Sequence, residues 1–292
     1  NIGPALTQNV SVFTPKVGLQ WQATDNAFLY ASYTRGFKSG GFSFTARNSY
    51  GAVFLPEYIS TYEFGAKTDW LDKKLRVNVA VFRNDWTNLQ VNSTVLIPNS
   101  TTPLTQASNA ATARNTGLDA EMIFKPWDGW TFTSDVTWIP DAVYVNYPNG
   151  QPNGTMNYLA KQRNDPRINA LSGAYDASGK RLMNNPTVSA AVSANKEFDL
   201  GNGNSAFIHV AGNYTGDTQF DITNDPIAKR NPFALMDFAA GWSSAGGHYQ
   251  IELWGRNILD KQYANTVLPG SKIPQIVPST PRTFGVQLNY TY

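Results

Sequence analysis

The final nine residues, 284–292, alternate strictly in polarity and end on an aromatic side chain. Every even-numbered residue among them is large and apolar, and every odd-numbered one is small or polar. A period of two is typical of a β-strand with one apolar and one polar face. A soluble sheet would rarely place an aromatic residue at its frayed end, whereas a strand of an outer-membrane barrel would. We take Gly285, Leu288, Tyr290 and Tyr292 as the candidate membrane-assembly signal.

Composition agrees with a barrel in a membrane. Charged residues make up 15% of the chain and aromatic residues 13%. Soluble domains average roughly 25% charged residues. Mean hydropathy is −0.34, and no apolar run approaches the ~20 residues of a transmembrane helix.

Net charge and cysteine content exclude several classes of function. The net charge is +2 and no basic block stands out, which argues against nucleic-acid binding. The lack of cysteine excludes disulfides, thiolate metal sites and cysteine nucleophiles. Neither a signal peptide nor an initiator methionine precedes Asn1, so we expect a processed product or a fragment.

About eleven strands are expected, joined by connections that are alternately short and long. The short connections, rich in Gly, Asn and Asp, are 24–26, 71–73, 126–129, 199–204 and 245–247. The long connections, rich in Gly, Pro, Asn, Ser and Thr, are 37–55, 91–112, 140–185, 218–232 and 258–279. Short turns on one side and long loops on the other are typical of outer-membrane barrels, whose long loops face outward.

The phase of the strands favours the same fold. Leu75, Val77, Val79 and Val81 share one face of a strand, and the charged residues fall on the opposite face, which we assign to the lumen. A soluble β-sandwich would alternate too, but the series of strands and the alternation of connection lengths favour the barrel. Because eleven is odd and single-chain bacterial barrels have even strand numbers, we expect the C-terminal part of a larger barrel.

Several stretches carry a resemblance to a known family. They are 30–42 (YASYTRGFKSGGF), 55–57 (LPE), 62–67 (YEFGAK), 81–90 (VFRNDWTNLQ), 115–121 (NTGLDAE), 257–263 (NILDKQY) and 281–285 (PRTFG). In this order and spacing, the chain resembles the C-terminal barrel half of TonB-dependent outer-membrane receptors over essentially its whole length. The resemblance implies an all-β transmembrane antiparallel barrel of 22 strands around an N-terminal plug. Residues 1–292 would supply about the last 11 strands, without the plug and the first strands.

The resemblance also implies a function and a location. Such receptors sit in the outer membrane of Gram-negative bacteria and actively import a scarce nutrient, most often a ferric siderophore, with energy supplied through TonB. TonB would contact the N-terminal part that is missing here. A passive porin, or a barrel with a docking or structural role, remains the alternative. Outer-membrane lipids and lipopolysaccharide are further expected partners, and nucleic acid is not.

Candidate ligand-binding residues lie in or beside the expected outward connections, and 140–185 is the expected main recognition element. The candidates are Arg35, Arg47, Trp86, Tyr144, Tyr147, Arg163 and Arg167. The arginines would attract a carboxylate-bearing ligand or lipopolysaccharide phosphates, or would simply be part of a solvated loop surface of mixed charge. The aromatic residues would anchor the interface, and some would also touch a ligand.

No catalytic residue, cofactor or metal site is predicted, and we expect no enzymatic activity. His209 and His248 are isolated in the sequence, and both are in phase with lumen positions, so we interpret them as polar groups of the wall. Glu63 and Lys67 are interpreted in the same way, as a wall network. The cluster at 221–225 contains oxygen ligands that calcium could use, but such a short acidic cluster is a weak signal.

Overall fold

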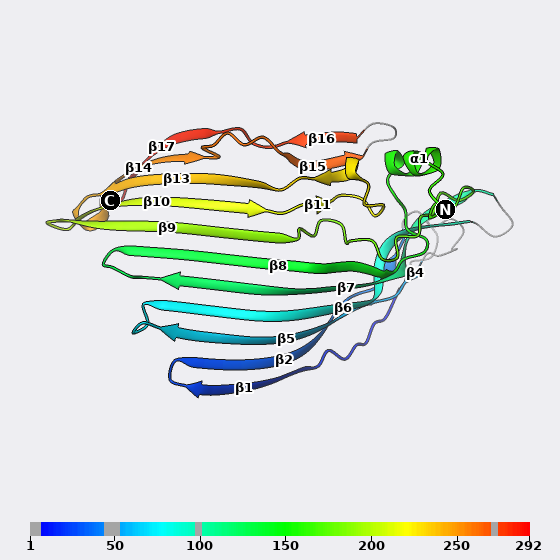
Figure 1. The fold of residues 1–292 in the computed structure, drawn as a ribbon, viewed down its shortest axis with the longest axis horizontal. Coiled ribbons are helices and arrows are strands. Elements are labelled where there is room, and N and C mark those ends of the chain that lie inside the picture. Colours follow the sequence, from blue (N-terminus) through cyan, green and yellow to red (C-terminus); the bar gives the residue numbers. More distant parts are fainter. Residues whose placement is uncertain (1–6, 44–52, 97–100, 270–273) are drawn as a thin grey trace.

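An eleven-stranded antiparallel sheet dominates the computed structural model, which describes residues 7–43, 53–96, 101–269 and 274–292 (Figure 1). Each strand pairs with the next along the sheet, so the spatial order follows the chain. The strands are β1 (Lys16–Thr24), β2 (Ala27–Lys38), β5 (Glu57–Trp70), β6 (Leu75–Leu96), β7 (Pro103–Phe124), β8 (Trp130–Asn146), β9 (Val188–Gly201), β10 (Asn204–Thr215), β13 (Phe233–Ser243), β14 (Tyr249–Arg256) and β17 (Thr283–Tyr290). The expected number of strands and their antiparallel order are confirmed.

The register places apolar side chains on one side of the sheet, which we call the outer face. Leu19, Ala31, Phe64, Val81 and Leu118 are partners on five successive strands. The same face continues to the far edge of the sheet. Since these positions alternate with polar ones, the opposite side, which we call the lumen face, carries most of the charge.

The candidate assembly signal spans both faces of β17. Leu288 lies on the outer face opposite Ile251 and is 72% exposed. The ring centroid of Tyr290 is 5.1 Å from that of Tyr249, and Tyr292 is exposed just beyond the strand. Gly285 faces the lumen, where an added Cβ would lie 2.3 Å from the indole ring of Trp254. A part for these residues in membrane assembly stays a prediction.

The short connections form tight turns, as expected. In the turn between β5 and β6, residues 71–73 have positive φ angles of 54° to 65°. Between β9 and β10, Gly201, Asn202 and Gly203 adopt the same left-handed backbone. Glycine and asparagine tolerate this conformation best, which is why they mark the β9–β10 turn in the sequence.

The long connections contain more regular structure than the sequence predicts. They hold the elements β3 (Gly41–Phe42), β4 (Val53–Phe54), α1 (Gly154–Gln162), β11 (Thr218–Gln219), η1 (Pro226–Ala228), β12 (Lys229–Arg230), β15 (Ala264–Pro269) and β16 (Pro274–Pro278). A further 3₁₀ turn, η2 (Ala245–Gly247), lies in the short β13–β14 connection. Among the described residues, no helix has both the length and the apolar character needed to cross a membrane.

The expected connection 91–112 is wrong in extent. β6 continues to Leu96 and β7 begins at Pro103, so most of this segment is a hairpin that extends the sheet outward. Hydroxyl pairs join its strands, with 2.5 Å between the Oγ atoms of Ser93 and Ser108. Polar side chains suggest a loop in the sequence, but paired across two strands they stabilise a sheet. β8 likewise runs to Asn146, so the connection to β9 is 147–187 rather than 140–185.

Candidate functional site

The long connections pack together at one end of the sheet into a folded unit, which we call the cap region. It consists of residues 147–187, residues 216–232 and the adjoining ends of β6, β7 and β8. In Figure 1 it lies at the end opposite the short turns, and α1 contacts β15 there. Its buried core comprises Ala111, Ala113, Tyr144, Tyr147, Ala160, Tyr175, Ala177 and Ile222. This core joins residues of β7 and β8 to residues of the connections 147–187 and 216–232. The cap region is therefore packed onto the sheet as one unit.

Helix α1 is held in place at its first turn. The side chain of Asn153 accepts a hydrogen bond from the backbone N–H of Met156, with an N···O distance of 3.1 Å. This is the N-cap contact that satisfies a free helix donor. Met156 and Ala160, four residues apart and therefore on one side of the helix, are both buried. The N-cap and the apolar face together fix α1 against the core.

Asp221 joins the two connections of the cap region. It is 2% exposed, and its carboxylate accepts hydrogen bonds from the backbone N–H groups of Asn153 and Thr223 at 3.0 and 2.9 Å. The side chains of the same two residues also donate to it. Burial raises the pKa of Asp221, and these hydrogen bonds oppose the rise. Asn153, which is 68 positions from Asp221 in the chain, is thereby fixed to this buried carboxyl group.

Three of the aromatic candidates belong to this core or pack on it. Tyr144 and Tyr147 are 5% and 2% exposed, and their ring centroids are 5.1 Å apart. The Tyr147 hydroxyl donates to the carbonyl of Asn92 at 2.5 Å, and burial raises its pKa. Trp86 packs against the same cluster. These side chains support the surface of the cap region from beneath, and their contact with a ligand stays a prediction.

Two of the arginine candidates are exposed on the cap region. Arg163 forms an ion pair with Asp225, and its side chain remains 56% exposed. Arg167 donates from Nη1 to the carbonyl groups of Asp176 and Ser178 at 3.1 and 2.8 Å. A guanidinium has five N–H donors, so each arginine has further N–H groups beyond those used in these contacts. Both arginines are thus exposed on the cap region, each held by a different partner.

Arg35, a further candidate, lies outside the cap region. Arg35 points to the outer face from β2, and its guanidinium carbon is 4.6 Å from the ring centroid of Tyr58. Arg47 lies outside the described residues.

Tyr175, Asp221 and Ile222 are central to the cap region and were not predicted to be. The sequence does carry a signal for α1, since Asn153 precedes a turn with Met156 and Ala160 at helical spacing. No local pattern in the sequence predicts which residues pack against Asp221 and Ile222. The carboxylate oxygens of Asp221 and Asp225 accept hydrogen bonds from N–H and O–H donors. A calcium ion would need these oxygens free, so the arrangement does not favour a calcium site. Among the described residues, no group of three or more His, Cys, Asp or Glu side chains could hold a metal ion.

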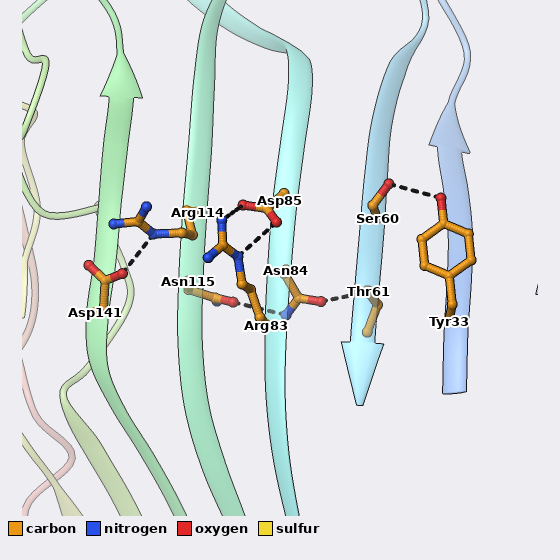
Figure 2. A network of polar contacts seen from close by, with 9 residues as sticks. All are labelled: Tyr33, Ser60, Thr61, Arg83, Asn84, Asp85, Arg114, Asn115 and Asp141. Atoms are coloured by element: carbon orange, nitrogen blue, oxygen red, sulfur yellow. Dashed lines mark hydrogen bonds and ion pairs between the residues drawn. The ribbon is translucent and has the colours of Figure 1, made fainter. Parts of the chain in front are cut away.

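The lumen face carries polar groups paired across strands. Figure 2 shows Thr61 donating to the Asn84 side chain at 2.6 Å, and Asn84 donating to Asn115 at 2.9 Å. His209 lies on the same face, opposite Asn195 and Ala239 in the register. Such hydrogen bonds between side chains of neighbouring strands are those expected on the polar inner wall of a barrel.

Comparison with known proteins agrees with this architecture. A family model described as the β-barrel of TonB-dependent receptor-like proteins matches residues 3–258. The metal-pseudopaline receptor CntO of Pseudomonas aeruginosa is 25% identical over 283 residues, covering 96% of this chain and 33% of that protein. This chain thus spans about a third of the length of that relative.

Two solved structures show the same fold. The ferric yersiniabactin uptake receptor FyuA from Yersinia pestis matches with a TM-score of 0.71 at 19% identity, covering 94% of this chain and 36% of that one. The siderophore receptor PiuA from Acinetobacter baumannii matches with a TM-score of 0.70 at 17% identity, covering 96% and 36%.

Proposed function

This chain belongs to the TonB-dependent receptor family of outer-membrane β-barrels, and from that membership we propose that it forms about half the wall of a nutrient-import receptor. The nutrient we propose is a metal–siderophore complex, in the first place a ferric siderophore. TonB would supply the energy through an N-terminal part of the receptor, outside residues 1–292. The names of CntO, FyuA and PiuA, each a receptor for a siderophore or a metal complex, support this proposal.

The observation that carries the proposal is the packed cap region. A surface held by a buried core and by Asp221 is preorganised, so less conformational entropy is lost when a ligand binds. Specificity in proteins commonly resides in long connections that a rigid scaffold positions, and this surface stands at the long-connection end of a β-barrel wall. A preorganised outward surface fits selective binding better than passive diffusion through an open pore.

We further propose that Arg163 and Arg167 contact the ligand. Both are exposed on the cap region and retain N–H donors, which suit the carboxylate or other anionic oxygens of a ferric siderophore. Tyr158, 47% exposed on α1, adds an aromatic surface nearby in the chain. Trp86, Tyr144 and Tyr147 would act by holding this surface in shape.

The test replaces residues 151–178 of the full-length receptor with a short Gly–Ser linker. The receptor is expressed in a Gram-negative strain that lacks its own copy, and uptake of radiolabelled iron is measured with a panel of siderophores. Uptake should fall to the level of a strain without TonB, while heat-modifiable gel mobility shows that the barrel still assembles. Substitution of the short turn 199–204 by an equally long Gly–Ser segment is the matched control and should preserve uptake.

Two results would count against the proposal. Uptake that survives the replacement would place recognition outside the cap region. Uptake by the unaltered receptor in a strain without TonB would favour the passive porin instead.

A further inference from the structure

A polar pocket lies at the end of the sheet where the short turns are. It has a volume of about 630 Å³ and is formed by the β5–β6 turn, the β7–β8 turn and β9. Its lining includes Lys74, Lys125, Trp127, Asp128, Thr131 and Glu197. In Figure 1 these turns lie at the end that carries the C-terminus, opposite the cap region. The short turns of an outer-membrane barrel face the periplasm, so the pocket opens toward that compartment.

Contacts between the β7–β8 turn and β9 hold the pocket in shape. Gly129 has a φ of 69°, and a Cβ added to it would clash with the carbonyl oxygen of Glu197. The backbone N–H of Glu197 donates to the carbonyl of Gly129 at 2.8 Å. The ammonium group of Lys196 donates to the carbonyl of Asp128, also at 2.8 Å. Because only glycine permits so close an approach, the turn and the strand form a fixed wall.

Two features of the lining favour a ligand that has a carboxylate and a ring with an apolar face. The backbone N–H of Lys125 donates to the carbonyl of Lys74 at 2.7 Å, so these two lysines come from adjacent backbone segments. Neither ammonium group has a hydrogen-bond or ion-pair partner in the described part of the chain, and both are free to bind a carboxylate. Trp127 is 67% exposed beside them and offers a large apolar ring.

The rest of the lining accepts hydrogen bonds. Asp128 and Glu197 contribute carboxylates and Thr131 a hydroxyl group, which accept from hydroxyl and amide donors. With the two lysines, the four charged side chains carry no net charge, so a ligand that is acidic throughout would gain little. A sugar with hydroxyl and acetamido groups and a nearby carboxylate finds a partner for each of these groups.

The position of the pocket narrows the choice of ligand further. Thr131 and Glu197 are on the lumen face of β8 and β9, which sets the pocket apart from the lipid-facing surface. A lipid headgroup is therefore not the favoured ligand. The periplasmic polymer with the required chemistry is peptidoglycan, whose N-acetylated sugars bear short peptides with free carboxylates.

We propose that this pocket binds peptidoglycan. One acetylated sugar stacks on the indole ring of Trp127, and a carboxylate of the attached peptide is held by Lys74 and Lys125. Asp128 and Glu197 accept hydrogen bonds from the hydroxyl and acetamido groups of the sugar. Such binding fixes the receptor to the cell wall, and it does not depend on which nutrient the receptor imports.

The test uses the full-length receptor in detergent micelles, titrated with the soluble disaccharide–tetrapeptide of peptidoglycan and with the same compound after its carboxylates are amidated. Calorimetry measures both affinities. The unaltered receptor should bind the carboxylate form about tenfold more tightly, since charge-assisted hydrogen bonds are the strong ones. Lys74→Gln combined with Lys125→Gln should abolish this preference. Trp127→Ala should weaken binding of both forms, and heat-modifiable gel mobility shows that each variant is assembled.

Lys73→Gln and Trp70→Ala are the matched controls. Lys73 is next to Lys74 in the same turn, and Trp70 is 57% exposed at the end of β5, but neither lines the pocket. Both variants should bind like the unaltered receptor. Failure of the full-length receptor to bind either compound would overturn the proposal, because another part of the receptor would then cover the pocket. Equal affinity for the two compounds, or an equal loss of binding in the controls, would also overturn it.

Discussion

Among single residues, Asp221 gives the cap region a defined response to pH. Burial raises its pKa above the unfolded value of about 4. Between these two pKa values the folded state binds more protons than the unfolded one, so its stability falls as pH rises through this window and then levels off. The amide protection factors of residues 147–187, which correct exchange rates for the intrinsic effect of pH, should therefore fall from pH 4 upward. Asp221→Asn should remove this pH dependence of protection, and Asp25→Asn, in an exposed turn, should keep it. Protection that rises with pH would contradict the assignment.

Neighbouring residues of the last strand should differ sharply in their tolerance of charge. Leu288 faces outward opposite Ile251, whereas Gln287 faces the lumen opposite Glu252. An arginine facing lipid costs about 2–4 kcal/mol at the membrane midplane and about 0–1 kcal/mol near the interface. Leu288 is two residues from the end of β17. Leu288→Arg in the full-length receptor should therefore reduce the heat-modifiable, assembled form in outer-membrane fractions, and Gln287→Arg should assemble normally. Equal tolerance of the two substitutions would refute the assignment of the faces.

Of the separate elements, α1 depends most on a single residue. Asn153 caps its first turn and also donates to Asp221, so Asn153→Ala removes two contacts at once. Loss of an N-cap costs about 1–2 kcal/mol, and the buried partner adds to this. Amide exchange across residues 154–162 should rise by about tenfold or more, with the sheet unaffected. Gln162→Ala, at the exposed end of the same helix, is the control and should change exchange little.

The whole sheet has two edges that the described residues leave open. β1 pairs only with β2, and β17 only with β14. Each unpaired backbone group in lipid costs several kcal/mol, so we propose that further strands of the receptor complete the barrel. Residues 1–292 refolded alone in detergent should give no heat-modifiable monomer, and the rest of the receptor, added as a separate polypeptide, should restore one. A stable monomer in which β1 pairs with β17 would disprove this.

The strands, their faces and the short turns could be predicted from the sequence. Alternation with a period of two is a local property, so residues 284–292 reveal their strand without any partner. The turn at 201–203 is equally local, because its glycines and asparagine set the backbone by themselves. The interpretation of the chain as the C-terminal half of a barrel rests on the same local pattern, because the number of strands was counted from it.

Only the tertiary structure decided how the cap region is built and which candidates are buried in it. From the sequence, Tyr144 and Tyr147 are predicted to be aromatic residues that anchor the interface. In the structure they are buried, and their burial depends on Ala160, Tyr175 and Ile222, which come from other segments. From the sequence, Asp221 belongs to a long connection, in a cluster whose oxygens calcium could use. In the structure it is buried and accepts hydrogen bonds from Asn153, far from it in the chain. Polarity along a strand is fixed by neighbours in the chain, whereas burial and charge pairing are fixed by neighbours in space.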